Sequence, residues 1–224
     1  MPEPQPARER ILSRLRAAPA RALPADPAPG GPVWAPPVHG DARLTRFRAM
    51  LEASRAEVHE AGAEDWPEIL RTILAAKGVG SVLYAPNTAT GRRLAEAWAD
   101  APAPTPALVA YDRPVEQVKP MLVERIDAAV TAALGGIAHT GTLVLWPTPE
   151  EPRLMSLLPP IHAVVVDRGT VADSLSAVIT AERWTDGMPT NAVLVSGPSK
   201  TADIEQTLAY GVHGPKELIV MVIG

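Results

Sequence analysis

The chain of 224 residues is 46% hydrophobic and 21% charged, with a formal net charge of −4 at pH 7 and no cysteine. This length and balance predict a globular protein that can bury one good core. The acidic charge, the single Phe and the three Tyr offer neither the basic surface nor the stacking rings that nucleic-acid-binding proteins use. Without cysteine, the chain itself has no disulfide, no thiolate nucleophile and no cysteine ligand for zinc or an iron–sulfur cluster.

Neither a membrane segment nor a metal site is expected from the sequence. No apolar run approaches the roughly 20 residues of a membrane-spanning helix, and the charged, proline-rich start lacks the apolar core of a signal peptide. The histidines are scattered, and no pair has metal-ligand spacing with a carboxylate nearby. We therefore expect a cytoplasmic protein with no membrane span and no metal or cofactor of its own.

Residues 1–37 are predicted to form an appendage to the core. Within them, residues 7–17 place Ile11, Leu12 and Leu15 on one stripe of a short helix, and the remainder is dense in Pro, Ala and Gly, which excludes a regular helix. A stripe that narrow needs a partner to bury it. The segment is either an arm that docks on another subunit, giving a homo-oligomer, or a disordered tail.

Residues 38–224 are predicted to form an α/β domain in which helices and strands alternate. Helical spacing of apolar residues, with start and stop signals, predicts helices over residues 41–61, 65–77, 88–99, 115–123, 170–183 and from Thr201 onward. Short apolar runs between turn signals predict strands over residues 81–85, 107–111, 128–131, 142–146, 161–167, 191–195 and 217–223. The run at 128–131 could instead begin a helix. Such alternation predicts a mostly parallel sheet with helices on both faces.

A strand, a polar loop and a helix in succession predict a ligand-binding turn that begins at Ser196. Gly197 lets the backbone turn tightly, and Ser199 or Thr201 can cap the helix, whose free N–H groups then suit a phosphate or carboxylate. Lys200 adds a cation there. In an open parallel sheet such a loop lies beyond the carboxyl end of its strand, where ligands bind. The alternative is an ordinary strand-to-helix turn, which uses the same residue types.

Two candidates for proton transfer accompany this turn. Asp203 lies in the first turn of the predicted helix, on the side of the proposed ligand, although a carboxylate there also suits the helix dipole. His213, next to Gly214, lies in a loop too rich in glycine to be a core position. Its role is either contact with the ligand or a hydrogen bond that stabilises the loop.

The segment from Thr140 to Thr142 is the third candidate part of the site. Thr140, Gly141 and Thr142 directly precede a strand-like run, so two hydroxyls and a flexible glycine would line the same crevice as the loop at Ser196. The alternative is a turn or bulge whose hydroxyls bond to backbone groups.

Three stretches, in this order along the chain, resemble the lactate-utilisation C (LUD-domain) family. They are residues 140–145, residues 156–162, and residues 196–205 followed by residues 211–215. The last is long enough to make chance a poor explanation. In that family the residue before Thr140 is commonly acidic, whereas this chain has His139, so a candidate carboxylate is absent and any acid–base role carried over from the family is in doubt.

The resemblance implies a fold similar to the ribose-phosphate isomerase, glucosamine-phosphate deaminase and CoA-transferase group. It also implies a component of a bacterial L-lactate utilisation system, which works with iron–sulfur partner subunits to oxidise L-lactate to pyruvate. A chain without cysteine would bind a small organic anion or organise the complex, and would oxidise no lactate alone. The alternative is a stand-alone isomerase or CoA-transferase-like enzyme acting on a phosphorylated or acyl small molecule, because one fold hosts many chemistries.

Overall fold

The computed structural model describes residues 7–17, 40–202 and 208–224 of a chain that divides into two compact units, Met1–Pro36 and Pro37–Gly224. In the first unit, the predicted short helix is present as α1 (Ala7–Ala17), on which Ile11 and Leu15 are exposed. The proline-rich segment, and with it the prediction made for it, lies outside the described residues. No helix in the described ranges has the length and apolarity needed to cross a membrane.

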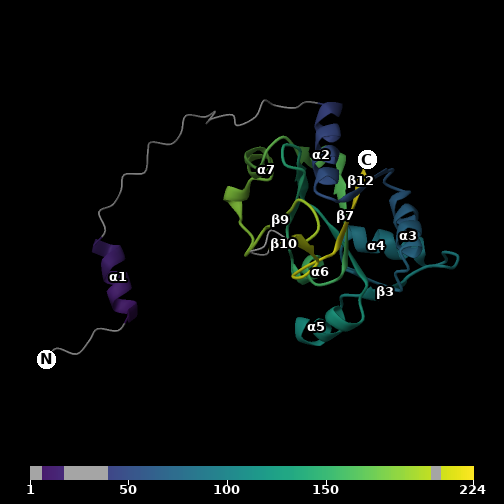
Figure 1. Ribbon diagram of the computed structural model, residues 1–224, viewed down its shortest axis with the longest axis horizontal. Coiled ribbons are helices and arrows are strands. Elements are labelled where there is room, and N and C mark those ends of the chain that lie inside the picture. Colours follow the sequence, from purple (N-terminus) through teal and green to yellow (C-terminus); the bar gives the residue numbers. More distant parts are fainter. Residues whose placement is uncertain (1–6, 18–39, 203–207) are drawn as a thin grey trace. The chain divides into compact units, whose positions relative to one another are not determined.

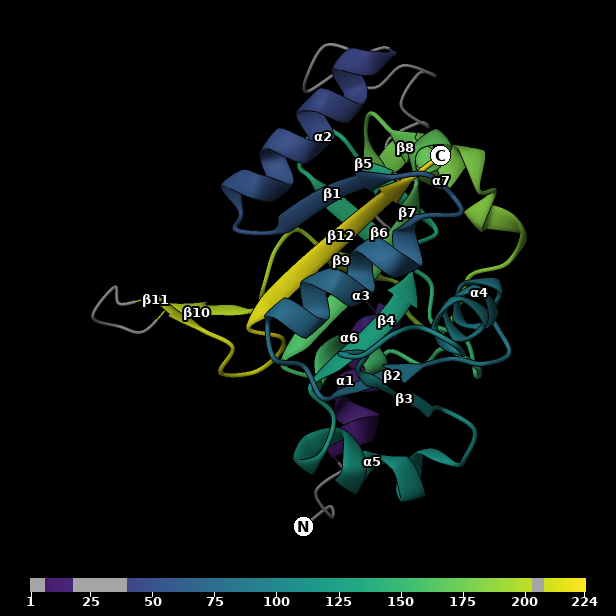
Figure 2. The same ribbon diagram turned by 90° about the vertical axis from the view of Figure 1, so that its right-hand side faces the viewer.

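A six-stranded parallel sheet is the centre of the second unit (Figures 1 and 2). Its strand order is β1-β12-β7-β4-β2-β3. The strands are β1 (Glu57–Ala61), β2 (Ser81–Tyr84), β3 (Ala107–Ala110), β4 (Ala128–Ala132), β7 (Ile161–Asp167) and β12 (Glu217–Ile223). β7 and β12 are neighbouring interior strands, and both are near-continuous apolar runs, as a sheet covered on both faces requires. The predicted α/β class and the mostly parallel sheet are therefore confirmed.

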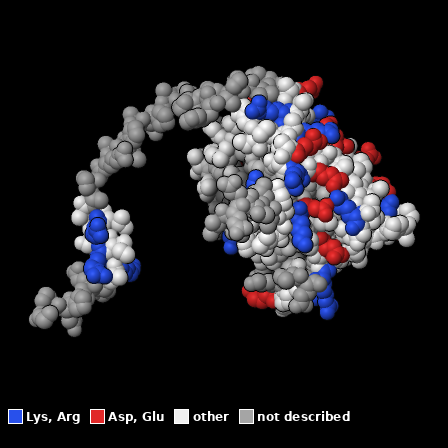
Figure 3. Space-filling view, viewed as in Figure 1, with Lys and Arg blue, Asp and Glu red and all other residues white. Residues whose placement is uncertain are grey.

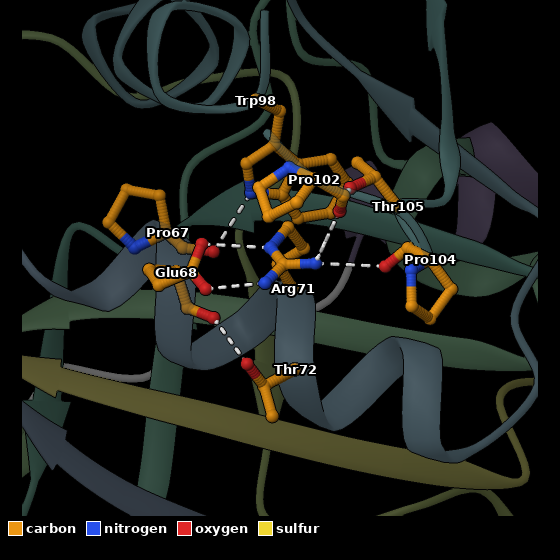
Figure 4. Close-up of polar contacts among 8 residues, drawn as sticks. All are labelled: Pro67, Glu68, Arg71, Thr72, Trp98, Pro102, Pro104 and Thr105. Carbon is orange, nitrogen blue, oxygen red and sulfur yellow. Dashed lines mark hydrogen bonds and ion pairs between the residues drawn. The ribbon is translucent and has the colours of Figure 1, made fainter. Parts of the chain in front are cut away.

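Helices α3 (Trp66–Ala76) and α4 (Ala89–Trp98) cover one face of this sheet (Figure 2). Both were predicted, and Thr88 caps α4 by accepting a hydrogen bond from the Gly91 N–H at 3.0 Å. The buried Arg71 guanidinium ties α3 to the loop after α4, where it donates to the carbonyls of Pro102 and Pro104 at 3.0 and 2.9 Å (Figure 4). These bonds, with the Glu68 carboxylate, satisfy a cation that would otherwise destabilise the core.

A second, four-stranded sheet packs on the opposite face, and the remaining helices pack either on that face or against the second sheet. The strand order of this second sheet is β8-β5-β6-β9. Its strands are β5 (Gly135–Ile137), β6 (Thr142–Leu145), β8 (Val171–Ala172) and β9 (Val193–Val195). The helices are α2 (Asp41–Ala53), α5 (Val115–Glu124), α6 (Leu154–Leu157) and α7 (Leu175–Ala181), with short 3₁₀ turns at Arg168–Thr170 and Trp184–Asp186. Phe47 and Leu51 of α2 lie fully buried between the two sheets.

Two of the predicted helices are longer in the sequence analysis than in the structure. The helix expected to reach residue 61 ends at Ala53, because Val58 is buried at the sheet edge where β1 pairs with β12. The helix expected over residues 170–183 begins only at Leu175, where the Ser174 hydroxyl caps it. The residues before it form β8, which hydrogen-bonds to β5, a further strand that sequence periodicity did not reveal.

The helix predicted from Thr201 is wrong as far as the structure describes that segment. Lys200–Ala202 is strand β10, which pairs in antiparallel fashion with β11 (Leu208–Tyr210). The preceding strand β9 belongs to the second sheet and runs antiparallel to β6. The loop at Ser196 therefore leads into a hairpin and does not leave the carboxyl edge of the parallel sheet.

Candidate functional site

A cavity of about 200 Å³ opens at the amino-terminal ends of β7 and β12. Its floor includes His162 and Leu218, which are the second residues of these strands and are paired across them. Its walls are Ser156 and Leu157 of α6, strand β9 with the loop after it, and the loop before β12. The expected position beyond the carboxyl ends of the parallel strands is wrong, because β9 lies in the second sheet.

Five residues predicted from the sequence come together around this cavity. They are Ser196, Gly197, Ser199, His213 and Gly214. The backbone joins their two loops: the Ser199 N–H donates to the Pro215 carbonyl at 2.9 Å, and the Gly211 N–H donates to the Ser199 carbonyl at 2.8 Å. Side chains from two distant stretches are thus held at one opening.

A chain of hydroxyls connects Thr140, Thr142 and Ser196. The Oγ1 atoms of Thr140 and Thr142 are 2.6 Å apart, and Thr142 Oγ1 is 2.7 Å from Ser196 Oγ. Thr142 is buried, whereas Thr140 is exposed at the surface. Neither threonine lies among the residues that line the cavity, so these hydroxyls contact the site through Ser196.

Gly141 and Gly197 allow close packing against the end of α2. Gly141 has φ +59°, and a Cβ there would lie 2.6 Å from both the backbone nitrogen of Leu51 and the carbonyl carbon of Met50. A Cβ at Gly197 would lie 2.5 Å from the Ser54 carbonyl oxygen. Packing therefore explains why both positions need glycine, and each glycine lies next to a member of the hydroxyl chain, Thr142 or Ser196.

The three other candidates near Ser196 are placed differently. Lys200 is exposed and Thr201 is half-buried, and both lie on strand β10 outside the cavity lining. Asp203 falls outside the described residues. The helix N-terminus that was expected to bind an anion is absent at Lys200, because the chain there is a strand.

The most buried polar side chain at the cavity, that of His162, was not predicted from the sequence as a site residue. His162 is 1% exposed, and its Nε2 is 2.8 Å from the Thr131 hydroxyl, which is also buried. Burial lowers the pKa of His162 to about 3, so the ring is neutral at physiological pH. The available signal was a histidine inside the otherwise continuous apolar run of β7.

Glu151 is a half-buried titratable group on the other side of Ser156. Its carboxylate accepts a hydrogen bond from the Ala132 N–H at 3.0 Å. Burial raises the pKa of Glu151 to about 7, although this hydrogen bond acts in the opposite direction. Glu151, Thr131 and Ser156 border one small void, and Ser156 also borders the main cavity.

One face of the molecule carries charges of both signs and no single basic surface. Lys and Arg side chains alternate with Asp and Glu on the face shown in Figure 3. Within the described ranges, no three His, Asp or Glu side chains gather as a metal site would require. Of the titratable groups that line the cavity, His213 is exposed at its mouth and His162 is buried at its floor.

Residues 44–223 match the family described as the LUD domain. The chain belongs to the LUD-domain family. Uncharacterized protein NMB1437 of Neisseria meningitidis serogroup B is similar over nearly the whole chain, with 36% identity over 224 residues that cover 97% of this chain and 93% of that protein. A crystal structure of a DUF162 family protein from Deinococcus radiodurans has the same fold, with a TM-score of 0.58 and 21% identity over 84% of this chain and all of that chain.

Other LUD-domain relatives match over a shorter region. Lactate utilization protein C of Deinococcus radiodurans is 36% identical over 107 residues, which cover 46% of this chain and 49% of the relative. Lactate utilization protein C of Bacillus licheniformis is 33% identical over 104 residues, which cover 45% of this chain and 43% of the relative. The match thus spans less than half of each of these relatives.

Proposed function

We propose that this LUD-domain protein is a component of a bacterial L-lactate utilisation system and binds a small organic anion in the cavity between its two loops. Iron–sulfur partner proteins would carry the electrons when L-lactate is oxidised to pyruvate, because this chain has no cysteine to hold a cluster. The names of the relatives from Deinococcus radiodurans and Bacillus licheniformis support the choice of system.

The observation that carries the proposal is the convergence of hydrogen-bonding side chains on one small cavity. Ser196 and Ser199 supply hydroxyls, and His213 supplies an exposed imidazole at the mouth. Drug-sized ligands need pockets of about 300–1,000 Å³. A cavity of about 200 Å³ therefore suits a ligand of few atoms, such as lactate or pyruvate.

Titration of the pure protein with L-lactate and pyruvate, read by calorimetry, tests the proposal. We expect Ser199→Ala to weaken binding about ten- to a hundred-fold, which is the effect of one hydrogen bond to a carboxylate. Lys200→Ala is the matched control on the neighbouring residue. Because Lys200 is exposed and outside the cavity lining, solvent screens its charge and we expect a change of less than about three-fold.

The outcomes of this titration separate the alternatives. If neither acid binds at millimolar concentration, the anion site in the isolated chain is wrong. If a sugar phosphate or an acyl-CoA binds and is turned over instead, the protein is a stand-alone isomerase or CoA-transferase-like enzyme, and the proposed role in lactate utilisation is wrong. If Lys200→Ala has the larger effect, the anion lies over strand β10 and not in the cavity.

The N-terminal helix supports a second part of the proposal, which is assembly with other subunits. Ile11 and Leu15 of α1 are 59% and 67% exposed, and so short a helix gains little stability without a partner. We expect deletion of residues 1–37 to lower the mass of the assembly measured by light scattering. The matched variant Ile11→Ser with Leu15→Ser should do the same while keeping the length, and an unchanged mass in both would show a passive tail.

A further inference from the structure

The His162 ring has one nitrogen to offer to a bound molecule. Its Nε2 contacts the Thr131 hydroxyl at 2.8 Å, and no other hydrogen-bond partner for the ring is found among the described residues. The ring lines the cavity, although the residue as a whole is only 1% exposed. Nδ1 is not one of the fully buried atoms left without a partner in the described residues, so it keeps some exposure to the cavity, and a ligand there can hydrogen-bond to it.

The position of His162 determines which part of a ligand it can meet. Ser196 and His213 are exposed at the mouth, whereas His162 lies at the buried floor. Burial of a charge costs far more than burial of a neutral hydrogen-bonding group, so a carboxylate belongs at the mouth. An uncharged oxygen on the neighbouring carbon would then point toward the floor.

We propose that His162 Nδ1 recognises the oxygen at position 2 of the ligand, so that the cavity selects 2-hydroxy and 2-oxo acids over simple carboxylic acids. This inference rests on the proposed anion site and specifies its ligand class. A ring that stays neutral suits the role, because it offers one donor or one acceptor and no charge that would compete for the carboxylate. Thr131 is a positioning residue, because its contact with Nε2 holds the ring orientation.

A series of three acids on the wild-type protein gives the first test. L-Lactate and pyruvate carry the oxygen at position 2, and propionate has the same carbon chain without it. We expect both to bind about two- to ten-fold more tightly than propionate, as one neutral hydrogen bond allows. Equal binding of all three would overturn the role of His162 and leave the anion site standing, whereas no binding of any would remove both.

Two substitutions of His162 separate the two ring nitrogens. The Asn amide nitrogen is bonded to Cγ, as Nδ1 is, whereas the Gln amide nitrogen is one bond further out, as Nε2 is. We therefore expect His162→Gln to keep the contact with Thr131 and lose the preference for L-lactate over propionate. His162→Asn is expected to keep that preference, with propionate affinity within about two-fold of wild type in both variants. A preference that survives in His162→Gln would overturn the proposal.

A spectroscopic measurement on the wild type covers the case in which neither variant folds. In protein with ¹⁵N-labelled histidine, saturating L-lactate should move the Nδ1 resonance of His162, and propionate should leave it in place. His213 serves as the internal reference, because it should respond to both acids if it contacts the carboxylate. Movement of the His213 signal alone would show that the ligand stays at the mouth and makes no contact with His162.

Discussion

Replacing Glu151 by Gln is expected to stabilise the protein by up to about 3 kcal/mol at pH 8 and to change little at pH 4. Burial raises the pKa of this carboxyl to about 7, from the usual value of 4.5. Between pH 4.5 and about pH 7, Glu151 keeps its proton in the folded state and has released it in the unfolded state, so the stability of the fold decreases as the pH rises. The difference between the folded and unfolded pKa values of Glu151, at about 1.4 kcal/mol for each pKa unit, gives the expected stabilisation.

The measurement is the free energy of unfolding in denaturant at pH 4 and pH 8. Gln has no charge to bury, and its carbonyl oxygen can still accept the hydrogen bond from the Ala132 N–H. Glu150→Gln is the matched control, because Glu150 is the exposed neighbour and its replacement should stay within about 0.5 kcal/mol at both pH values. Equal stabilisation by the two variants at pH 8 would point to relief of net negative charge and contradict the role of burial.

The pKa of His162 makes the pH dependence of the wild type flatter than that of Glu151→Gln. Burial lowers the pKa of His162 to about 3. Below pH 6.5 this imidazole is therefore protonated in the unfolded chain but stays neutral in the folded chain. The stability gained from the neutral buried ring is complete above pH 6.5 and is lost on acidification. Between pH 4.5 and 6.5 the two groups oppose each other, and Glu151→Gln should reveal the acid loss caused by His162.

Local signals were enough to predict the middle of the fold. β7 and β12 are long apolar runs between turns, and α3 and α4 each have a clear apolar stripe. The pattern of residues within each of these elements is therefore enough to predict it. β1 depends instead on pairing with β12, which lies at the other end of the chain. β5, β8 and the β10–β11 hairpin are two- or three-residue strands, too short to show a period.

The candidate site was predicted where sequence chemistry is visible and missed where burial creates it. Ser196, Ser199 and His213 lie in polar, glycine-containing loops, and the structure places them at one cavity. His162 and Glu151 look ordinary in sequence, since only tertiary packing removes them from water and moves their pKa values. The wrong helix at Thr201 shows the opposite error, in which loop chemistry was read as a helix start.

Gly141→Ala is expected to destabilise the protein by about 2–5 kcal/mol, although the residue carries no side chain and lies beside the proposed site. At φ +59° an alanine costs about 1–2 kcal/mol by itself. Its Cβ would also lie 2.6 Å from backbone atoms of Met50 and Leu51, which cannot move aside as a flexible side chain would. The free energy of unfolding in denaturant measures the sum.

Gly78→Ala is the matched control that isolates the packing against α2. Gly78 has φ +74°, and a Cβ there would meet nothing within 4 Å, so only the conformational cost of about 1–2 kcal/mol remains. If the two variants lost the same stability, the close approach of Gly141 to α2 would not be what requires glycine. A larger loss in Gly141→Ala would show that the close approach of α2 is what requires glycine between Thr140 and Thr142.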